Sequence, residues 1–197
     1  MLNWLKNKKH PEFWTNYLNE YENSSPRYVT LSVESTGTNP NKDVILSIGA
    51  VGIENNQLKI KDSFEIVLLQ YIFNHDNGLS NEFIIESKMP KFIESEGMQR
   101  FIKYIGNAII IGHRVDVAIE MMNVALEKLD CGKLKNQALD LEIMFRKWKE
   151  QSNDKKFSLE EIARALKIPE ENADLSIEKA YIIGLSFLKL KKYLEIE

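Results

Sequence analysis

Apolar runs in the first third of the chain have the length and composition of β-strands. Residues 28–33 are rich in β-branched side chains and precede a turn-like segment at 37–41. Two further apolar runs, at 44–53 and 58–69, are separated by the polar residues 54–57, which are typical of a hairpin turn. Because short turns join these three runs, we predict an antiparallel meander of three strands.

The rest of the chain alternates between helical spacing of apolar positions and short apolar runs. The short runs at 108–111 and 134–139 predict two more strands. Ser158 and Glu161 have the spacing of a capping box, which marks the start of a helix. Apolar positions predict helices over 93–107, 115–129, 140–150, 158–166 and 176–193, with a weaker helix over 79–86. Three antiparallel strands followed by strands and helices in alternation favour an α/β fold with a mixed sheet.

The first 26 residues form a separate segment that is too short to be a domain. Trp14, Leu18 and Tyr21 lie at helical spacing, which predicts an amphipathic helix docked on the main body. The alternative interpretation is a basic, aromatic arm that contacts nucleic acid or a partner protein. We therefore divide the chain into an N-terminal helical extension, 1–26, and one domain, 27–197.

Composition narrows the chemistry that the chain can support. It has 26 Lys and Arg residues against 29 Asp and Glu residues, a net charge of −3, which excludes a polybasic nucleic-acid coat protein. One cysteine, Cys131, and three scattered histidines cannot form an internal disulfide or a zinc cluster. Without a membrane-spanning run or a secretion signal, we expect a soluble cytoplasmic protein. Any metal would have to be a hard ion held by carboxylates.

Three segments carry the strongest motif signal in the chain. The first reads Ser32-Val33-Glu34-Ser35-Thr36-Gly37 and is followed by a strand that contains Ile48-Gly49-Ala50-Val51. The second reads Gly112-His113-Arg114-Val115-Asp116-Val117-Ala118, and the third reads Asp174-Leu175-Ser176-Ile177-Glu178-Lys179-Ala180. Together, over about residues 27–192, they resemble the motifs of the DEDDh 3′-5′ exonucleases, the family typified by the epsilon proofreading subunit of bacterial DNA polymerase III.

The resemblance implies a two-metal exonuclease site whose reactive residues are mostly replaced in this chain. In the family, four carboxylates hold two divalent ions, and a histidine takes the proton from the attacking water. The corresponding carboxylate positions here are Ser32, Glu34, Ala118 and Lys179, and Asp174 stands at the position of the histidine. Glu34 is thus the only retained catalytic residue and the sole remaining candidate metal ligand. We expect no metal or other cofactor.

Neighbouring acids are not expected to replace the missing carboxylates. Asp116 lies about 200° around a helix from Ala118, and Glu178 lies about 100° from Lys179, so both should face away from the site. Asp174 is the acid most suited to remain in the pocket beside Glu34. We hypothesise that the Lys179 ammonium replaces the lost metal charge by pairing with Glu34 or Asp174, the alternative being an ordinary solvated lysine.

Three further residues are candidates for substrate binding under the same resemblance. Thr36 and Gly37 follow Glu34, and in the family these positions line the pocket for the terminal nucleotide. A turn that requires glycine explains Gly37 equally well. His113 lies at a strand-to-helix junction, where we expect a hydrogen-bonded structural histidine and not a metal ligand.

The fold implied is a ribonuclease H-like sheet of five strands in the order 3-2-1-4-5, flanked by helices. The favoured function is that of a degenerate, inactive exonuclease homologue that acts as a nucleic-acid-binding, nucleotide-binding or regulatory module. One alternative is an active 3′-5′ exonuclease with a rearranged site that uses Mg²⁺ or Mn²⁺. The other is a purely structural protein-interaction domain whose N-terminal extension contacts a partner.

Overall fold

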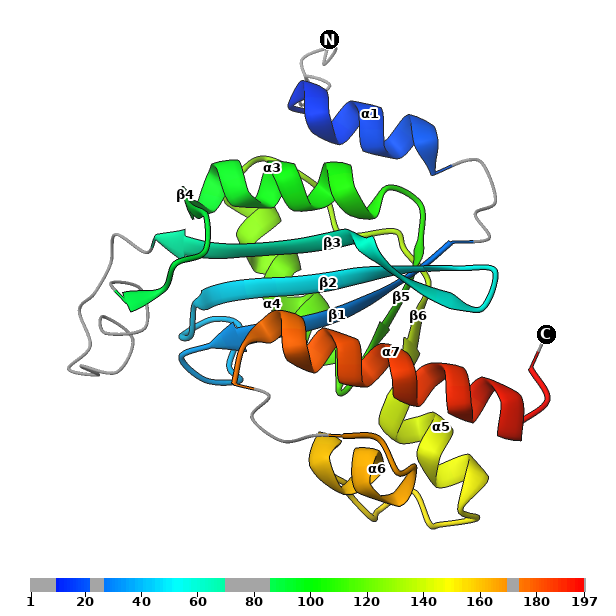
Figure 1. Cartoon of the computed structure of the whole chain (residues 1–197). Helices are drawn as coiled ribbons and strands as arrows, with labels where there is room; N and C mark the ends of the chain where they lie inside the picture. Colours follow the sequence, from blue (N-terminus) through cyan, green and yellow to red (C-terminus); the bar gives the residue numbers. More distant parts are fainter. Residues whose placement is uncertain (1–9, 22–26, 70–85, 170–173, 197) are drawn as a thin grey trace, which may run out of the picture.

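A six-stranded mixed sheet in the order β4-β3-β2-β1-β5-β6 forms the centre of the molecule (Figure 1). The computed structural model describes residues 10–21, 27–69, 86–169 and 174–196. The strands are β1 (Tyr28–Ser35), β2 (Ile45–Glu54), β3 (Gln57–Leu69), β4 (Lys91–Ile93), β5 (Ile109–Gly112) and β6 (Ala138–Asp140). Strands β1, β2 and β3 form the predicted antiparallel meander, and β5 and β6 run parallel to β1.

The predicted order is correct for five of these strands, but the predicted number is too small. The additional strand, β4, joins the edge of the sheet in parallel with β3. It has three residues, and a strand that short is too brief to show an alternating pattern in the sequence. The strand predicted over 134–139 is also shorter and begins later, at Ala138.

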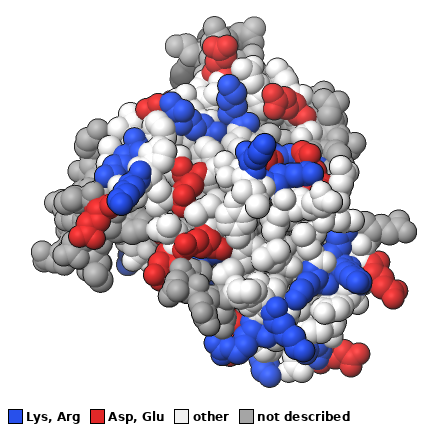
Figure 2. All heavy atoms as spheres, in the orientation of Figure 1, with Lys and Arg blue, Asp and Glu red and all other residues white. Residues whose placement is uncertain are grey.

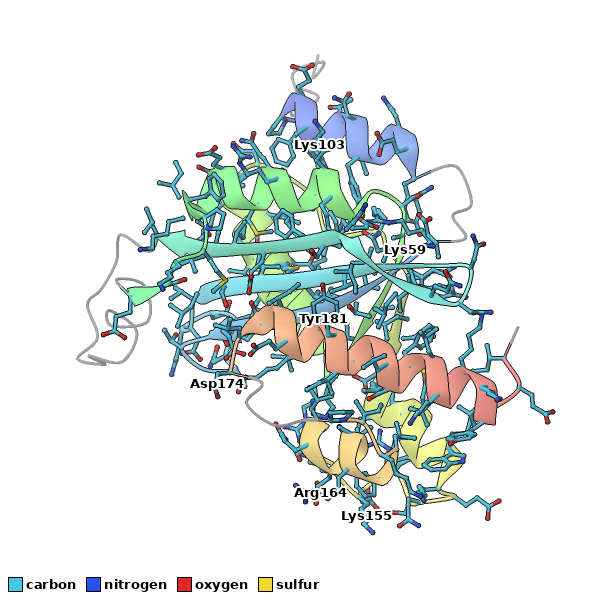
Figure 3. The ribbon with its side chains drawn as sticks, viewed as in Figure 1. Lys59, Lys103, Lys155, Arg164, Asp174 and Tyr181 are labelled. Atoms are coloured by element: carbon cyan, nitrogen blue, oxygen red, sulfur yellow. The ribbon has the colours of Figure 1, made fainter. Side chains whose placement is uncertain are left out.

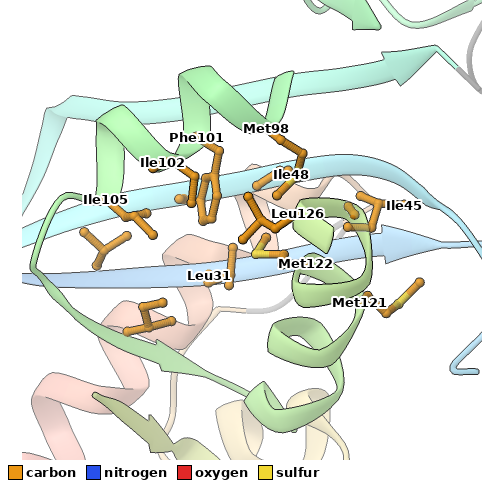
Figure 4. Packing of buried hydrophobic residues seen from close by; sticks show 14 of the residues in the cluster. Leu31, Ile45, Ile48, Met98, Phe101, Ile102, Ile105, Met121, Met122 and Leu126 are labelled. Atoms are coloured by element: carbon orange, nitrogen blue, oxygen red, sulfur yellow. The ribbon is translucent and has the colours of Figure 1, made fainter. Parts of the chain in front are cut away.

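Helices cover both faces of the sheet (Figure 1). One face packs against α3 (Glu94–Ile105) and α4 (Val115–Glu127), whose buried side chains meet those of the strands in a common hydrophobic core (Figure 4). The other face packs against α7 (Ser176–Tyr193), and α5 (Leu141–Trp148) and α6 (Leu159–Ala165) extend that second core. Strand β1 serves both cores, because Val29 and Leu31 point towards α3 and α4 while Thr30 contacts α7.

The predicted helices agree with the structure to within a few residues at each end. The capping box at the start of α6 is complete, since Glu161 N–H donates to Ser158 Oγ at 3.2 Å and Ser158 N–H donates to Glu161 Oε2 at 2.8 Å. The weaker helix predicted over 79–86 lies almost wholly outside the described residues. Among the helices in the described ranges, none combines the length and the apolar character needed to cross a membrane.

The N-terminal helix α1 (Glu12–Glu20) docks on the main body, as its apolar spacing predicts. Trp14 and Tyr17 are buried in the core shared with α3 and α4. The Tyr17 hydroxyl donates to Asn136 Oδ1 at 2.6 Å and accepts from Lys135 N–H at 2.7 Å. These contacts attach α1 to the segment that leads into β6.

The first turn of α7 rests directly on the backbone of β2. A Cβ atom added at Gly49 would lie 2.3 Å from Ile177 N, so only glycine permits this approach. Beside it, the hydroxyls of Ser47 and Ser176 lie 3.2 Å apart in a buried hydrogen bond. These contacts between α7 and β2 determine the position of the next turn of α7, which carries Lys179, relative to the sheet.

Candidate functional site

A cleft of about 480 Å³ opens between the end of β1, the start of α4, the start of α6 and the first half of α7. All four positions that the resemblance assigns to metal-binding carboxylates line it, although they come from three distant parts of the chain. The polar residues of the lining are Ser32, Glu34, Ser35, Thr38, His113, Arg114, Ser158, Glu160 and Lys179.

Glu34 and Lys179 form an ion pair across this cleft. Lys179 Nζ lies 2.7 Å from Glu34 Oε1, and the two side chains retain 29% and 30% of their exposure. The strand alternation that points Thr30 towards α7 also points Ser32 and Glu34 to that side, which is why an α7 side chain can reach Glu34. The pair hypothesised for Lys179 is present, with Glu34 as its partner.

The neighbouring acids Asp116 and Glu178 are directed elsewhere. Asp116 is exposed and lines an adjacent groove, whereas Ala118 lines the cleft. Glu178 Oε2 accepts a hydrogen bond from Leu175 N–H at 3.0 Å and so caps its own helix. Helix geometry therefore separates both acids from the site, as expected from their angular offsets.

Asp174 stands apart from the cleft lining. It lies just before α7, which begins at Ser176, and its side chain is exposed (Figure 3). The resemblance assigns Asp174 to the position of the family's histidine, and the predicted helix over 176–193 already begins after it. In the structure it belongs to the connection that precedes the helix, and the pocket role expected for it has no contact to support it.

Thr36 and Gly37 hold the loop after β1 together. The Thr36 hydroxyl donates to Asp43 Oδ1 at 3.1 Å and accepts from Val44 N–H at 3.1 Å. A Cβ atom at Gly37 would lie 2.5 Å from Asp43 Oδ2, so the close approach of this side chain, and not a left-handed backbone angle, favours glycine in the turn. The loop instead presents Thr38 to the cleft.

His113 is a hydrogen-bonded structural histidine, although it also lines the cleft. Its Nε2 lies 2.8 Å from the carbonyl oxygen of Phe157, and because a carbonyl only accepts, Nε2 carries the proton. The bond ties the segment before α4 to the segment before α6. His113 thereby helps to hold two walls of the cleft at a fixed separation.

Glu160 is a cleft residue that sequence reasoning missed. Its pKa is lowered chiefly by hydrogen bonds from its own backbone N–H and from the Ser158 hydroxyl, with smaller contributions from the charges of His113 and Lys179. The capping box was the available signal, because it places the acid that follows Leu159 at the first turn of a helix. Nothing in the sequence showed that this helix start faces the cleft.

The donor set of the cleft does not fit a pair of divalent ions. Among its described lining residues, two carboxylates, Glu34 and Glu160, are balanced by the cations Arg114 and Lys179. Mg²⁺ and Mn²⁺ need several oxygens that converge on one point. Within the part of the chain that the structure describes, no group of three or more His, Cys, Asp or Glu side chains is placed to hold a metal.

The buried carboxylate of Glu142, beside the cleft, connects the elements that form the cleft walls. Glu142 accepts a hydrogen bond from Phe157 N–H at 2.9 Å, pairs with Arg146 at 3.0 Å and approaches Arg114 at 3.5 Å. Next to it, Asp140 caps α5 and also accepts from Val115 N–H at 2.9 Å. We call these contacts of Glu142 the Glu142 cluster, and they join α4, α5 and the segment before α6.

The sequence of this chain is similar to those of several DNA polymerase III proteins. No protein-family model matches the chain. It is 26% identical over 195 residues to DNA polymerase III PolC-type from Clostridium perfringens (strain 13 / Type A), covering 91% of this chain and 12% of that protein. It is 23% identical over 171 residues to DNA polymerase III subunit epsilon from Aquifex aeolicus (strain VF5), covering 83% of this chain and 79% of that one. The chain is thus similar in sequence to these DNA polymerase III proteins, in line with its resemblance to the DEDDh 3′-5′ exonucleases.

Solved structures agree on the exonuclease-like fold. E. coli exonuclease I in complex with a dT13 oligonucleotide superposes with a TM-score of 0.71 at 14% identity, over 87% of this chain and 42% of that one. Cell-death related nuclease 4 superposes with a TM-score of 0.64 at 12% identity, over 85% of this chain and 64% of that one. The exonuclease-like chain thus spans about an eighth of its PolC-type relative and less than half of exonuclease I.

Proposed function

We propose that this exonuclease-like chain is a degenerate member of its family that binds single-stranded nucleic acid in the cleft without hydrolysing it. The observation that carries the proposal is the ion pair between Lys179 and Glu34, whose atoms lie 2.7 Å apart. In two-metal hydrolysis one ion activates water and the other neutralises the leaving oxygen. An ammonium supplies one positive charge and no open coordination site, so it can steady a phosphate but cannot activate water.

Nucleic acid is the favoured ligand for two reasons. The relatives are DNA polymerase III proteins, and exonuclease I of the same fold binds oligonucleotides. In addition, Arg114 and Lys179 offset the charges of Glu34 and Glu160, so a phosphate can approach this cleft without bound metal ions to overcome repulsion. A partner protein bound through α1 receives less support, because Trp14 and Tyr17 are buried against the main body.

A nuclease assay separates the degenerate site from a rearranged active one. The purified protein is incubated with 5′-labelled single-stranded DNA and Mn²⁺ or Mg²⁺, beside Glu34→Ala and an active DEDDh exonuclease. We expect no shortening of the DNA by the wild type or by Glu34→Ala. Shortening by the wild type that disappears in Glu34→Ala would overturn the proposal.

A binding measurement tests the positive half of the proposal. Fluorescence anisotropy of a labelled single strand is followed without divalent ions at increasing salt. We expect binding whose logarithmic affinity falls linearly with the logarithm of the salt concentration, because contacted phosphates release counterions. Anisotropy that stays at the value of the free strand at every salt concentration would contradict nucleic-acid binding.

A further inference from the structure

The α5–α6 region carries a positive charge that the chain as a whole does not. Residues 146–167 hold seven basic side chains against four acidic ones, in a protein whose net charge is −3. Six of the seven are exposed. In Figure 2 blue side chains outnumber red ones in the lower part of the visible face, over α6 and the end of α7. The basic residues of this segment are Arg146, Lys147, Lys149, Lys155, Lys156, Arg164 and Lys167.

Aromatic rings accompany these charges. Trp148 at the end of α5 stacks on Tyr193 at the end of α7, with ring centroids 4.9 Å apart and planes 14° apart. Lys149 Nζ lies 4.0 Å from the Trp148 ring centroid, and Lys155 Nζ lies 5.1 Å from that of Phe157. Tyr193 retains 49% of its exposure, so one aromatic surface remains open to a ligand.

This region is continuous with the cleft. A groove of about 840 Å³ shares Thr38, Arg114 and Val117 with the cleft lining and extends to Asn153 and Lys156 in the α5–α6 connection. Four acidic residues line this groove: Asp116 and Glu120 on α4, Asp140 at the N-terminus of α5, and Glu142 on α5. Glu142 is already paired with Arg146 and Arg114, and Asp140 accepts hydrogen bonds from backbone N–H groups. A phosphate chain that leaves the cleft towards α5 therefore meets the exposed cation Lys156 beside carboxylates whose charge is already compensated.

We propose that the α5–α6 region and the end of α7 form a second subsite, which holds the part of a single strand that extends out of the cleft. The inference rests on the nucleic-acid binding proposed above. One exposed ring, Tyr193, beside the half-buried Trp148 and among lysines and arginines suits a single strand, because the bases of a single strand are free to stack while its phosphates pair with the cations. A duplex offers phosphates but keeps its base faces stacked inside the helix.

Binding by strands of two lengths tests the subsite. A trinucleotide reports on the cleft alone, and a single strand of about twelve nucleotides spans both subsites. The test variants are Lys155→Glu/Arg164→Glu, which removes subsite charge, and Tyr193→Ala, which removes the exposed ring. Lys59→Glu/Lys103→Glu is the matched control, since it makes the same charge change on other parts of the surface (Figure 3). Circular dichroism verifies that each variant is folded.

For the longer strand we expect affinity to fall about ten-fold or more in each test variant and to change little in the control. Affinity for the trinucleotide should be unaltered in all three. The logarithmic salt slope for the longer strand should also shrink in Lys155→Glu/Arg164→Glu, by about 0.7 for each phosphate that the variant no longer binds.

The outcomes separate this inference from the proposed function. If the wild type binds both strands and the test variants bind the longer strand as the wild type does, the second subsite is refuted while the cleft proposal stands. If the wild type binds neither strand, the function proposed for the cleft fails and the subsite fails with it. A loss that Lys59→Glu/Lys103→Glu reproduces would show a general charge effect and would also refute the subsite.

Discussion

Two carboxylates with cationic partners, Glu142 and Glu34, line neighbouring hollows of this fold and differ in how many of their hydrogen-bonding positions are occupied. The Glu142 side chain is 7% exposed and has three partners, two of them guanidinium groups and one a backbone N–H. The Glu34 side chain is 30% exposed and pairs through one oxygen with Lys179, at the open cleft. A buried carboxylate whose oxygens both have partners stabilises the fold. An accessible carboxylate that is only partly paired remains available to a ligand.

This difference in burial and pairing also distinguishes the residues that hold the walls of the cleft together from the residues that a ligand can reach. The Glu142 cluster joins three elements through contacts that an exposed ligand site cannot supply. The pair between Glu34 and Lys179 lies where the resemblance puts metal ions, and solvent reaches it. We therefore expect removal of Glu142 to affect folding and changes at Glu34 or Lys179 to affect binding.

The largest expected effect is loss of stability in Glu142→Ala. Removing this carboxylate leaves Arg146, whose side chain is 15% exposed, without its buried counter-charge. Such a loss costs about 3–5 kcal/mol of unfolding free energy. Urea denaturation followed by circular dichroism measures it, with the exposed Glu127→Ala on α4 as control. If the unfolding free energy of Glu142→Ala fell by less than about 1 kcal/mol, Glu142 would contribute no more to stability than an exposed ion pair, and the distinction from Glu34 would be wrong.

The next effect is gain of metal binding when the cleft is made acidic again. In Ser32→Asp/Ala118→Asp/Lys179→Asp three new carboxylates join Glu34 in the lining of the same cleft. Mn²⁺ should then bind, and at a hundred-fold excess over its dissociation constant it should stabilise the variant by about 2.7 kcal/mol.

Isothermal titration and thermal unfolding with and without Mn²⁺ provide the measurement for this variant. Lys179→Met is the control that removes the ammonium without adding a carboxylate. Wild-type protein that binds Mn²⁺ as tightly as the triple variant would show that the existing donors suffice, and the degenerate interpretation of the cleft would fail.

A small effect is expected for the ion pair itself. Both side chains of the Lys179 and Glu34 pair keep nearly a third of their exposure, so solvent screens much of their attraction. Lys179→Met should change the unfolding free energy by about 0–1 kcal/mol. A double-mutant cycle with Glu34→Gln isolates the interaction, and a coupling as large as that of a buried pair would contradict the comparison.

The smallest effect concerns the titration of Glu160. Its pKa lies below the ordinary value of 4.5, so its contribution to stability is complete above the unfolded-state pKa and is lost as pH falls through the folded-state pKa. Lys179→Met should raise this pKa only in part, because the hydrogen bonds to Glu160 are the larger cause. Carboxyl-carbon NMR titration follows the change, and an unaltered pKa would show that Lys179 has no influence on Glu160.

Most of the fold could be predicted from the sequence, because the regularly spaced apolar residues are the same residues that pack in the core. The meander, the helix starts and the docking of Trp14 all follow from apolar spacing. Strand β4 could not be predicted. Its three residues show no alternating pattern in the sequence, and they form a strand only because they pair with β3 in the folded chain.

The candidate site was predictable as a set of positions and less so as a set of contacts. The resemblance to the DEDDh exonucleases assigned Ser32, Glu34, Ala118 and Lys179 to one site, and all four line the cleft. Glu142 and Glu160 were missed because their importance comes from elements that meet only in the folded chain. The pocket role expected for Asp174 came from the position of the family's histidine, whereas in the structure Asp174 is an exposed residue of the connection before α7.

The contact at Gly49 has an evolutionary consequence. The seat of α7 on β2 is made by main-chain atoms and by the absence of a side chain, and none of these atoms takes part in the chemistry of the cleft. The side chains that face the cleft can therefore be substituted without disturbing the contact that positions α7 against the sheet. A lineage that lost its reaction could keep the shape that the reaction had required.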